Sequence, residues 1–166
     1  MMPARGTIAD LDAGLRTSRS PGRGPSWGWL AAAAVMVAFI WGNSLVPGTG
    51  SSGLSLAVAH AVQAVLDACG LPFAWVTNFL VRKAAHFTEY AVLGFLIMRG
   101  ARPGTPARRG AIAAVAAALV LVPAVDETIQ LFVPGRSGMV ADVLLDMCGG
   151  ATGSAIAHAW MRLRRR

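Results

Sequence analysis

Charged and amide side chains interrupt the apolar stretches of this sequence, and their chemistry is the first question it raises. They are Arg82, Lys83, His86, Glu89, Asp126, Glu127, Gln130, Arg136, Asp142 and Asp146. Acids, bases and an imidazole in one place can bind a charged group, hold a metal ion or transfer protons. A charged side chain at the centre of a membrane helix costs about 2.5–3.5 kcal/mol even on mild insertion scales, so these groups should face one another or water.

Helical spacing allows these side chains to meet. Arg82, His86 and Glu89 fall on one stripe of a helix, and Asp142 lies one turn before Asp146. At about 1.5 Å of rise per residue, the polar groups of the segments around residues 78–98, 111–133 and 139–160 all lie in the half nearest one membrane face. We therefore predict one polar pocket that opens to the extracytoplasmic side, with Arg136 of the 134–138 turn at its mouth.

Formal charge in this predicted pocket is unbalanced, because its acids outnumber its fixed cations. A protonated carboxyl, a charged His86 or a bound cation would restore the balance. For a divalent cation, the oxygen-rich donors Asp126, Glu127 and Asp142 suit Mg²⁺ or Ca²⁺ better than Zn²⁺. His86 could act as a general base, a metal ligand or the partner of a carboxylate. A purely structural ion network that fixes helix packing is the alternative to a functional pocket.

The elements that must position these groups are membrane helices. The 166 residues are 55% hydrophobic and only 14% charged, with a mean hydropathy of +0.55, which argues against a disordered chain or an ordinary soluble domain. Apolar runs at 27–46, from 75 or 78 to 98, 111–133 and 139–160 are each long enough to cross ~30 Å of hydrocarbon. We predict an all-α polytopic membrane protein with four transmembrane helices, plus one short amphipathic extracytoplasmic helix over residues 54–69.

Basic residues define the predicted domains and orientation. The net charge of +7 comes from clusters in the N-terminal 25 residues, in the 99–110 loop and at the C-terminus. The positive-inside rule then puts both termini in the cytoplasm. We expect a mobile tail at 1–25, a membrane domain at 26–161 and a basic end at 162–166. The clusters flank apolar runs without interleaved aromatic residues, so a nucleic-acid partner is not expected.

Three motifs within residues 78–157 resemble those of the VanZ-like family. They read K-x-x-H-F-x-E-Y-x-x-L-G from Lys83, D-E-x-x-Q-x-F-x-P-G-R from Asp126, and D-x-x-x-N/D-x-x-G from Asp142. Asp146 stands where that family often carries Asn, which adds a negative charge. The resemblance implies a small bacterial multi-pass membrane protein, whose name-giving member is associated with low-level resistance to the glycopeptide teicoplanin. It supplies no mechanism.

Two functions fit these residues. In the first, the outward pocket of a cell-envelope protein binds the polar or anionic head group of a membrane lipid or lipid-linked cell-wall precursor, with Arg82, Lys83 and Arg136 on the phosphate. Such binding would affect glycopeptide susceptibility. The alternative is an intramembrane enzyme on a lipid-linked phosphate, with His86 or Glu89 as general acid or base and Asp126 with Glu127 holding a metal. The sequence leaves open whether any reaction is catalysed.

Overall fold

The protein is helical throughout the part of the chain that the structure, a computed structural model, describes: residues 25–101 and 108–164. The helices are α2 (Trp27–Ser44), α3 (Gly48–Ala68), α4 (Asn78–Ala101), α5 (Arg108–Leu131) and α6 (Val140–Leu163). No strand is present in these two ranges, so the predicted all-α class is confirmed. Residues 1–24 of the predicted tail, residues 102–107 of the predicted 99–110 loop and residues 165–166 of the predicted basic end lie outside the described residues.

Three helices are long and apolar enough to cross a membrane: Trp27–Ser44, Arg109–Leu131 and Val140–Leu163. Little of each is buried inside the protein, and large apolar side chains such as Val35 and Leu121 are exposed. Exposed apolar surface on this scale is expected where lipid replaces water as the solvent. The chain is a multi-pass membrane protein by its helix composition.

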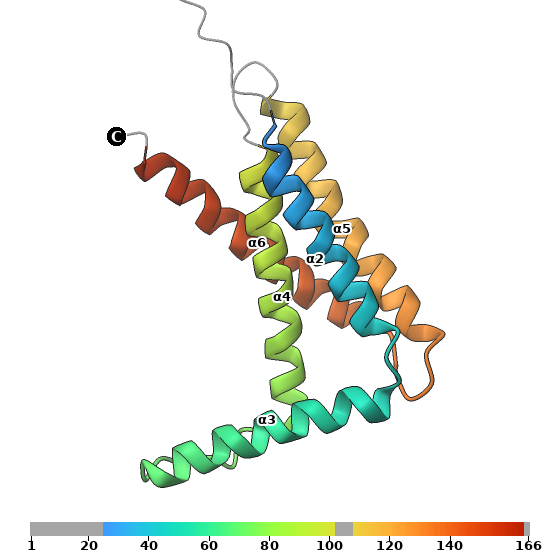
Figure 1. Ribbon diagram of the computed structural model, residues 1–166, viewed down its shortest axis with the longest axis vertical. Helices are drawn as coiled ribbons and strands as arrows, with labels where there is room; N and C mark the ends of the chain where they lie inside the picture. The colour runs from blue at the N-terminus through green and yellow to red at the C-terminus, as the bar shows by residue number, and fades with distance from the viewer. Residues whose placement is uncertain (1–24, 102–107, 165–166) are drawn as a thin grey trace, which may run out of the picture.

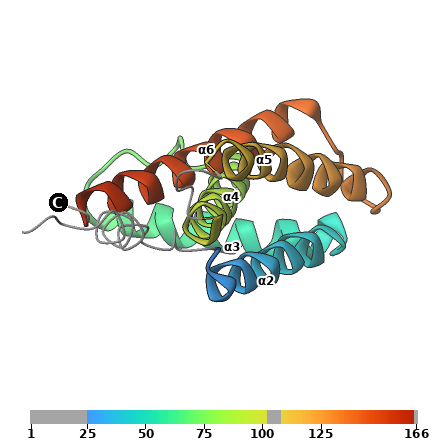
Figure 2. The same ribbon diagram turned by 90° about the horizontal axis from the view of Figure 1, so that it is seen from above.

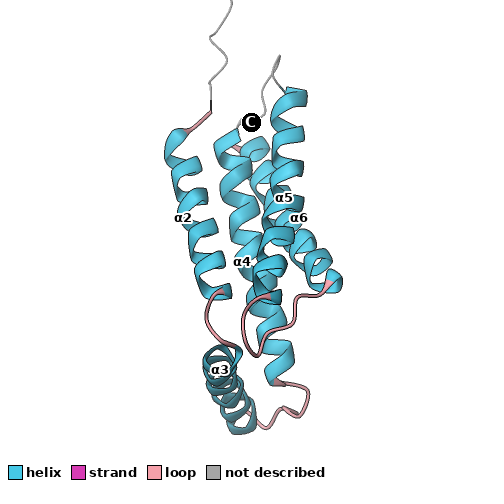
Figure 3. Ribbon diagram, turned by 90° about the vertical axis from the view of Figure 1, so that its right-hand side faces the viewer, coloured by secondary structure: helices cyan, strands magenta, loops and turns pink. Residues whose placement is uncertain are grey.

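Four of the described helices form a bundle, and the fifth, α3, lies across one end of it. α2, α4 and α5 run roughly along the long axis in alternating directions, and α6 crosses α4 obliquely (Figure 1). α3 lies across the lower end, and it is seen nearly end-on when the molecule is turned by 90° (Figure 3). Seen from above, α4 lies between α2 on one side and α5 and α6 on the other (Figure 2). Because α4 contacts every other described helix, its side chains reach all of them.

The α4–α6 contact is the most extensive in the fold, and glycine makes it possible. A Cβ atom at Gly94 of α4 would overlap the carbonyl oxygen of Gly150, and one at Gly153 of α6 would overlap that of Ala91. Small residues of this kind let two membrane helices approach backbone to backbone. The Ser154 hydroxyl also donates to the Gly94 carbonyl at 3.1 Å. Close approach here fixes the polar side chains that lie along the same faces.

α3 differs from its prediction. The helix expected over residues 54–69 begins already at Gly48, so it has 21 residues rather than being short. The Gly48 N–H donates to the Pro134 carbonyl at 3.0 Å, and a Cβ at Gly48 would overlap the carbonyl oxygen of Gly135. Gly135 has a positive φ of 74° that glycine adopts without strain. This tertiary contact holds the start of the helix, and local turn propensity is overridden.

Candidate functional site

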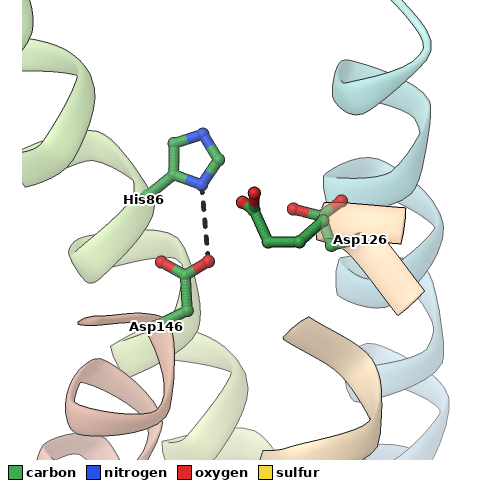
Figure 4. A group of neighbouring side chains, drawn as sticks. His86, Asp126 and Asp146 are labelled. Carbon is green, nitrogen blue, oxygen red and sulfur yellow. Dashed lines mark ion pairs between the residues drawn. The ribbon is translucent and has the colours of Figure 1, made fainter. Parts of the chain in front are cut away.

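The polar residues predicted from sequence lie in three groups, of which the most buried is a cluster of His86, Asp126, Glu127 and Asp146. Each residue offers one nitrogen or oxygen atom, and all four atoms lie within 4.8 Å of one another. Asp126, Glu127 and Asp146 are 0%, 4% and 1% exposed. His86 projects from α4 and Asp146 from α6, and both point toward Asp126 of α5 (Figure 4). We call this group the acid cluster.

Gln130 organises two of the carboxylates in the acid cluster. It lies one helical turn after Asp126 on α5, and its amide nitrogen is 3.3 Å from Asp126 Oδ2 and 3.2 Å from Glu127 Oε1. The same amide lies 3.3 Å from the Ser44 hydroxyl of α2. The Met139 N–H donates to Glu127 Oε2 at 2.8 Å, so this carboxylate satisfies a backbone donor at the start of α6. Glu127 is therefore held on both of its oxygens.

Four other atoms of the acid cluster have no hydrogen-bond partner. His86 Nδ1 is 3.6 Å from Asp146 Oδ2, which is an ion-pair distance but longer than a hydrogen bond (Figure 4). Buried atoms without a hydrogen-bond partner include His86 Nδ1, Asp126 Oδ1 and both carboxylate oxygens of Asp146. Buried polar atoms are paired in the great majority of cases, so this concentration of unpaired ones marks the cluster as unusual.

Lys83 and Asp142 form the second group. They make an ion pair between α4 and α6, and the Lys83 ammonium also lies 5.2 Å from the centre of the Phe79 ring. Asp142 was predicted as a metal ligand together with Asp126 and Glu127. The structure instead engages its carboxylate with Lys83, and the atoms that converge beside Asp126 and Glu127 belong to His86 and Asp146.

The third group lines a partly open cavity of about 340 Å³ between α2, α3 and α4. Its apolar wall includes Ile40, Val46, Leu54, Val58, Val81 and Ala85, and its polar lining includes Asn43, Ser44, Arg82, His86, Glu89 and Arg136. Of the residues predicted to share one pocket, only Arg82, His86, Glu89 and Arg136 line this cavity. His86 belongs to both the cavity and the acid cluster, and it connects them.

Arg136 reaches the cavity from the 134–138 turn while closing the end of α2. Its Nε donates to the Val46 carbonyl at 2.9 Å and its Nη2 to the Asn43 carbonyl at 2.7 Å. A cation is favourable at a helix C-terminus, where carbonyl groups lack partners. Burial, and after it the positive charge of Arg82, lowers the pKa of Arg136 from its ordinary value. Two guanidinium groups therefore repel each other at one cavity.

Several residues at the site were missed by the sequence analysis. Asn43 and Ser44 line the cavity from the end of α2, and their signal was a pair of polar residues at the end of an otherwise apolar run. Tyr90 is fully buried next to Asp126. It directly follows Glu89 in the first motif, which could have drawn attention to it.

Comparison with known proteins identifies the family. The sequence model of the VanZ/LLP1 family matches residues 29–162. The chain belongs to the VanZ/LLP1 family. No curated protein and no solved structure shows significant similarity to it. The VanZ/LLP1 match extends beyond the motifs at 78–157 and includes α2 and α3, so the whole cavity and the whole acid cluster fall within the family region.

Proposed function

We propose that this VanZ/LLP1 protein crosses the bacterial cell membrane four times and binds the anionic head group of a lipid or lipid-linked cell-wall precursor in the α2–α3–α4 cavity. Both termini would lie in the cytoplasm and the cavity on the outer side. Occupancy of the cavity would change susceptibility to glycopeptides of the teicoplanin type. The observation that carries the proposal is the pairing of Arg82 and Arg136 at an otherwise mainly apolar cavity.

The fourth crossing is assigned to α4. This helix has 24 residues, as many as α6, and it runs beside α2 and α5 in the opposite direction (Figure 1). Its charged side chains in the 82–89 segment face the acid cluster, the cavity or Asp142, so they need not contact lipid. Arg99, Arg109 and Arg162 lie at the opposite end of the bundle from α3. The positive-inside rule assigns that end to the cytoplasm.

The cavity fits an anionic amphiphile. Guanidinium groups match phosphate and carboxylate geometry through parallel hydrogen bonds, and an anion between two of them would relieve their repulsion. Arg82 forms no ion pair among the described residues, so it is available to a ligand. The aliphatic side chains of α2 and α3 offer the matching surface for the first methylene groups of a lipid. Lys83, which was also predicted to contact phosphate, is engaged by Asp142 instead.

Lipid binding tests the proposal directly. The purified chain is reconstituted in nanodiscs that contain a neutral lipid with or without phosphatidylglycerol or an undecaprenyl-phosphate-linked precursor, and retained lipid is quantified by mass spectrometry. We expect selective retention of an anionic lipid, reduced about tenfold or more in Arg82→Gln. The matched control, Arg109→Gln, changes an exposed arginine at the other end of the bundle. Equal retention by all three proteins would refute the head-group site.

Cysteine labelling tests the orientation. In a variant without Cys69 and Cys148, both of which are exposed free thiols, a single cysteine is placed by Ser137→Cys or by Gly110→Cys. A membrane-impermeant maleimide added to intact cells should label the first variant and leave the second unlabelled until the cells are opened. The reverse pattern would put Arg136 in the cytosol and overturn the outward cavity.

The second candidate function is an enzyme. It is favoured by one observation, namely that His86 and Glu89 line the same cavity as the two arginines. An imidazole and a carboxyl within reach of a bound phosphate ester could act as general base and general acid. Phosphate release from a panel of lipid-linked phosphates, lost in His86→Gln and Glu89→Gln, would support catalysis. Binding without turnover of any member of the panel would leave head-group binding as the function.

A further inference from the structure

A second site lies behind the cavity, in the acid cluster of His86, Asp126, Glu127 and Asp146. We propose that this cluster binds one divalent cation, for which Mn²⁺ is the matching probe, whether or not a lipid occupies the cavity. The ion would join α4, α5 and α6, because each of these helices supplies at least one ligand.

The spacing of the four donor atoms suits a single ion. Ligand atoms on opposite sides of a divalent cation lie roughly 4.0–5.2 Å apart, which is twice a metal–ligand distance of about 2.0–2.6 Å. All four donor atoms of the cluster lie within 4.8 Å of one another. The side chains labelled in Figure 4 point toward a common centre from separate helices. Small side-chain movements would complete the coordination.

The hydrogen bonding of the cluster points to a ligand rather than to a closed network. His86 Nδ1, Asp126 Oδ1 and both oxygens of Asp146 are buried without a hydrogen-bond partner. One cation at their centre would satisfy these atoms together. The fourth residue, Glu127, is oriented by Gln130 and by the Met139 N–H. Carboxylates that ligate metals are themselves usually positioned by such hydrogen bonds.

Charge leads to the same conclusion. Three buried carboxylates are gathered here, and within the described ranges their only ion-pair partner is His86. Lys83 is engaged by Asp142, while Arg82 and Arg136 line the cavity. Uncompensated buried charge is strongly unfavourable, and a divalent ion would offset most of it.

The donor set indicates the class of ion. Three carboxylates favour hard cations such as Mg²⁺, Ca²⁺ and Mn²⁺, whereas an imidazole favours transition metals over Ca²⁺. Mn²⁺ satisfies both preferences. An ion could reach the cluster through the cavity, because His86 lines it and keeps 20% of its side chain exposed.

Metal binding to the full chain tests the proposal without any lipid ligand. The protein is purified in a neutral detergent, stripped with EDTA and dialysed, and Mn²⁺ is titrated while the electron paramagnetic resonance signal of the free ion is recorded. We expect one Mn²⁺ per chain, with affinity reduced about tenfold or more in Asp146→Asn. The matched control is Asp142→Asn, one turn earlier on α6, which should keep the wild-type stoichiometry and affinity. Zn²⁺ and Mg²⁺ competition ranks the ions.

Thermal unfolding gives a second readout. Because a ligand that binds only the folded state stabilises it, Mn²⁺ should raise the Tm of the wild type and of Asp142→Asn but not of Asp146→Asn. If Asp146→Asn does not fold, Asp126→Asn carries the same expectation.

Three results would overturn the ion site: no Mn²⁺ binding by the wild type, equal binding by all variants, or equal loss in the two α6 variants. Arg82→Gln should bind Mn²⁺ normally. Failure of the ion site is therefore distinguishable from failure of the head-group site.

Discussion

The two sides of α4 differ in how they are packed and in which charge they carry. Toward α6, glycines bring the backbones into contact, and Asp126 and Asp146 are almost completely buried beside that interface. Toward α2 and α3 the packing is loose enough to leave a cavity, and the charged groups that end there include two arginines. The comparison teaches that three buried acids gather beside the closely packed α4–α6 interface, whereas the ligand-accessible cations lie at a cavity on the other side of α4.

Because the two sides of α4 are packed differently, we expect mutations on them to affect stability differently. A side chain in a close-packed membrane interface has no room to adapt, so a change there alters the folded state itself. A side chain at a cavity wall can change with little effect on packing, unless it also makes hydrogen bonds elsewhere, as Arg136 does at the end of α2. The next four experiments test this expectation, from the largest expected effect on stability to the smallest.

Gly94→Ala should be the most damaging change. The new Cβ would overlap the carbonyl oxygen of Gly150, and backbone cannot move aside cheaply, so we expect a loss of about 2–3 kcal/mol or failure to fold. The control is Gly42→Ala on α2, where no atom lies within 4 Å of the added Cβ and helix propensity predicts a slight gain. Folded yield and Tm in detergent are measured. Equal Tm values for the two variants would contradict the close packing of α4 against α6 at Gly94.

Arg136→Gln should cost about 1.5–3 kcal/mol, because two charge-assisted hydrogen bonds to the end of α2 are lost. Arg136→Lys keeps the charge but not the two-pronged geometry, so its Tm should lie between those of the wild type and the glutamine variant. Thermal unfolding without added lipid measures this structural contribution. If Arg136→Gln had the wild-type Tm, the hydrogen bond between the Gly48 N–H and the Pro134 carbonyl would be sufficient to hold the 134–138 turn.

Lys83 and Asp142 should show a coupling of about 1 kcal/mol in a double-mutant cycle of Lys83→Met and Asp142→Asn. Their side chains are 25% and 18% exposed, so the pair is neither fully screened nor fully desolvated. Chemical or thermal unfolding of the wild type, both single variants and the double variant gives the coupling. Strict additivity would show that the ion pair does not contribute to the α4–α6 interface.

Arg82→Gln should change stability least, by no more than about 0.5 kcal/mol, since Arg82 has no ion-pair partner among the described residues. Its Tm is compared with that of Arg136→Gln under the same conditions. A loss as large as that of Arg136→Gln would mean that both arginines are structural and that the two sides of α4 do not differ as proposed.

Much of the fold followed from hydropathy. The runs predicted as membrane spans correspond to α2, α4, α5 and α6, with ends that differ by only a few residues. α3 was predicted too short, because Gly48 and its neighbours have turn propensity and the contact with Pro134 that makes them helical is distant in sequence. Lys83 and Asp142 were singled out as polar residues of two predicted membrane helices, but periodicity could not show that their side chains pair with each other.

The sequence by itself determined which side chains are exceptional, because the cost of placing charge in hydrocarbon depends on residue type and on the length of the apolar run. The tertiary structure alone decided how those side chains are divided. Helix periodicity fixes the face on which His86 or Asp146 lies, but the rotation and crossing of α4 against α6 depend on where glycines allow contact. That packing sends His86 toward Asp146, while Arg82 lines the adjoining cavity together with Arg136, which the end of α2 holds.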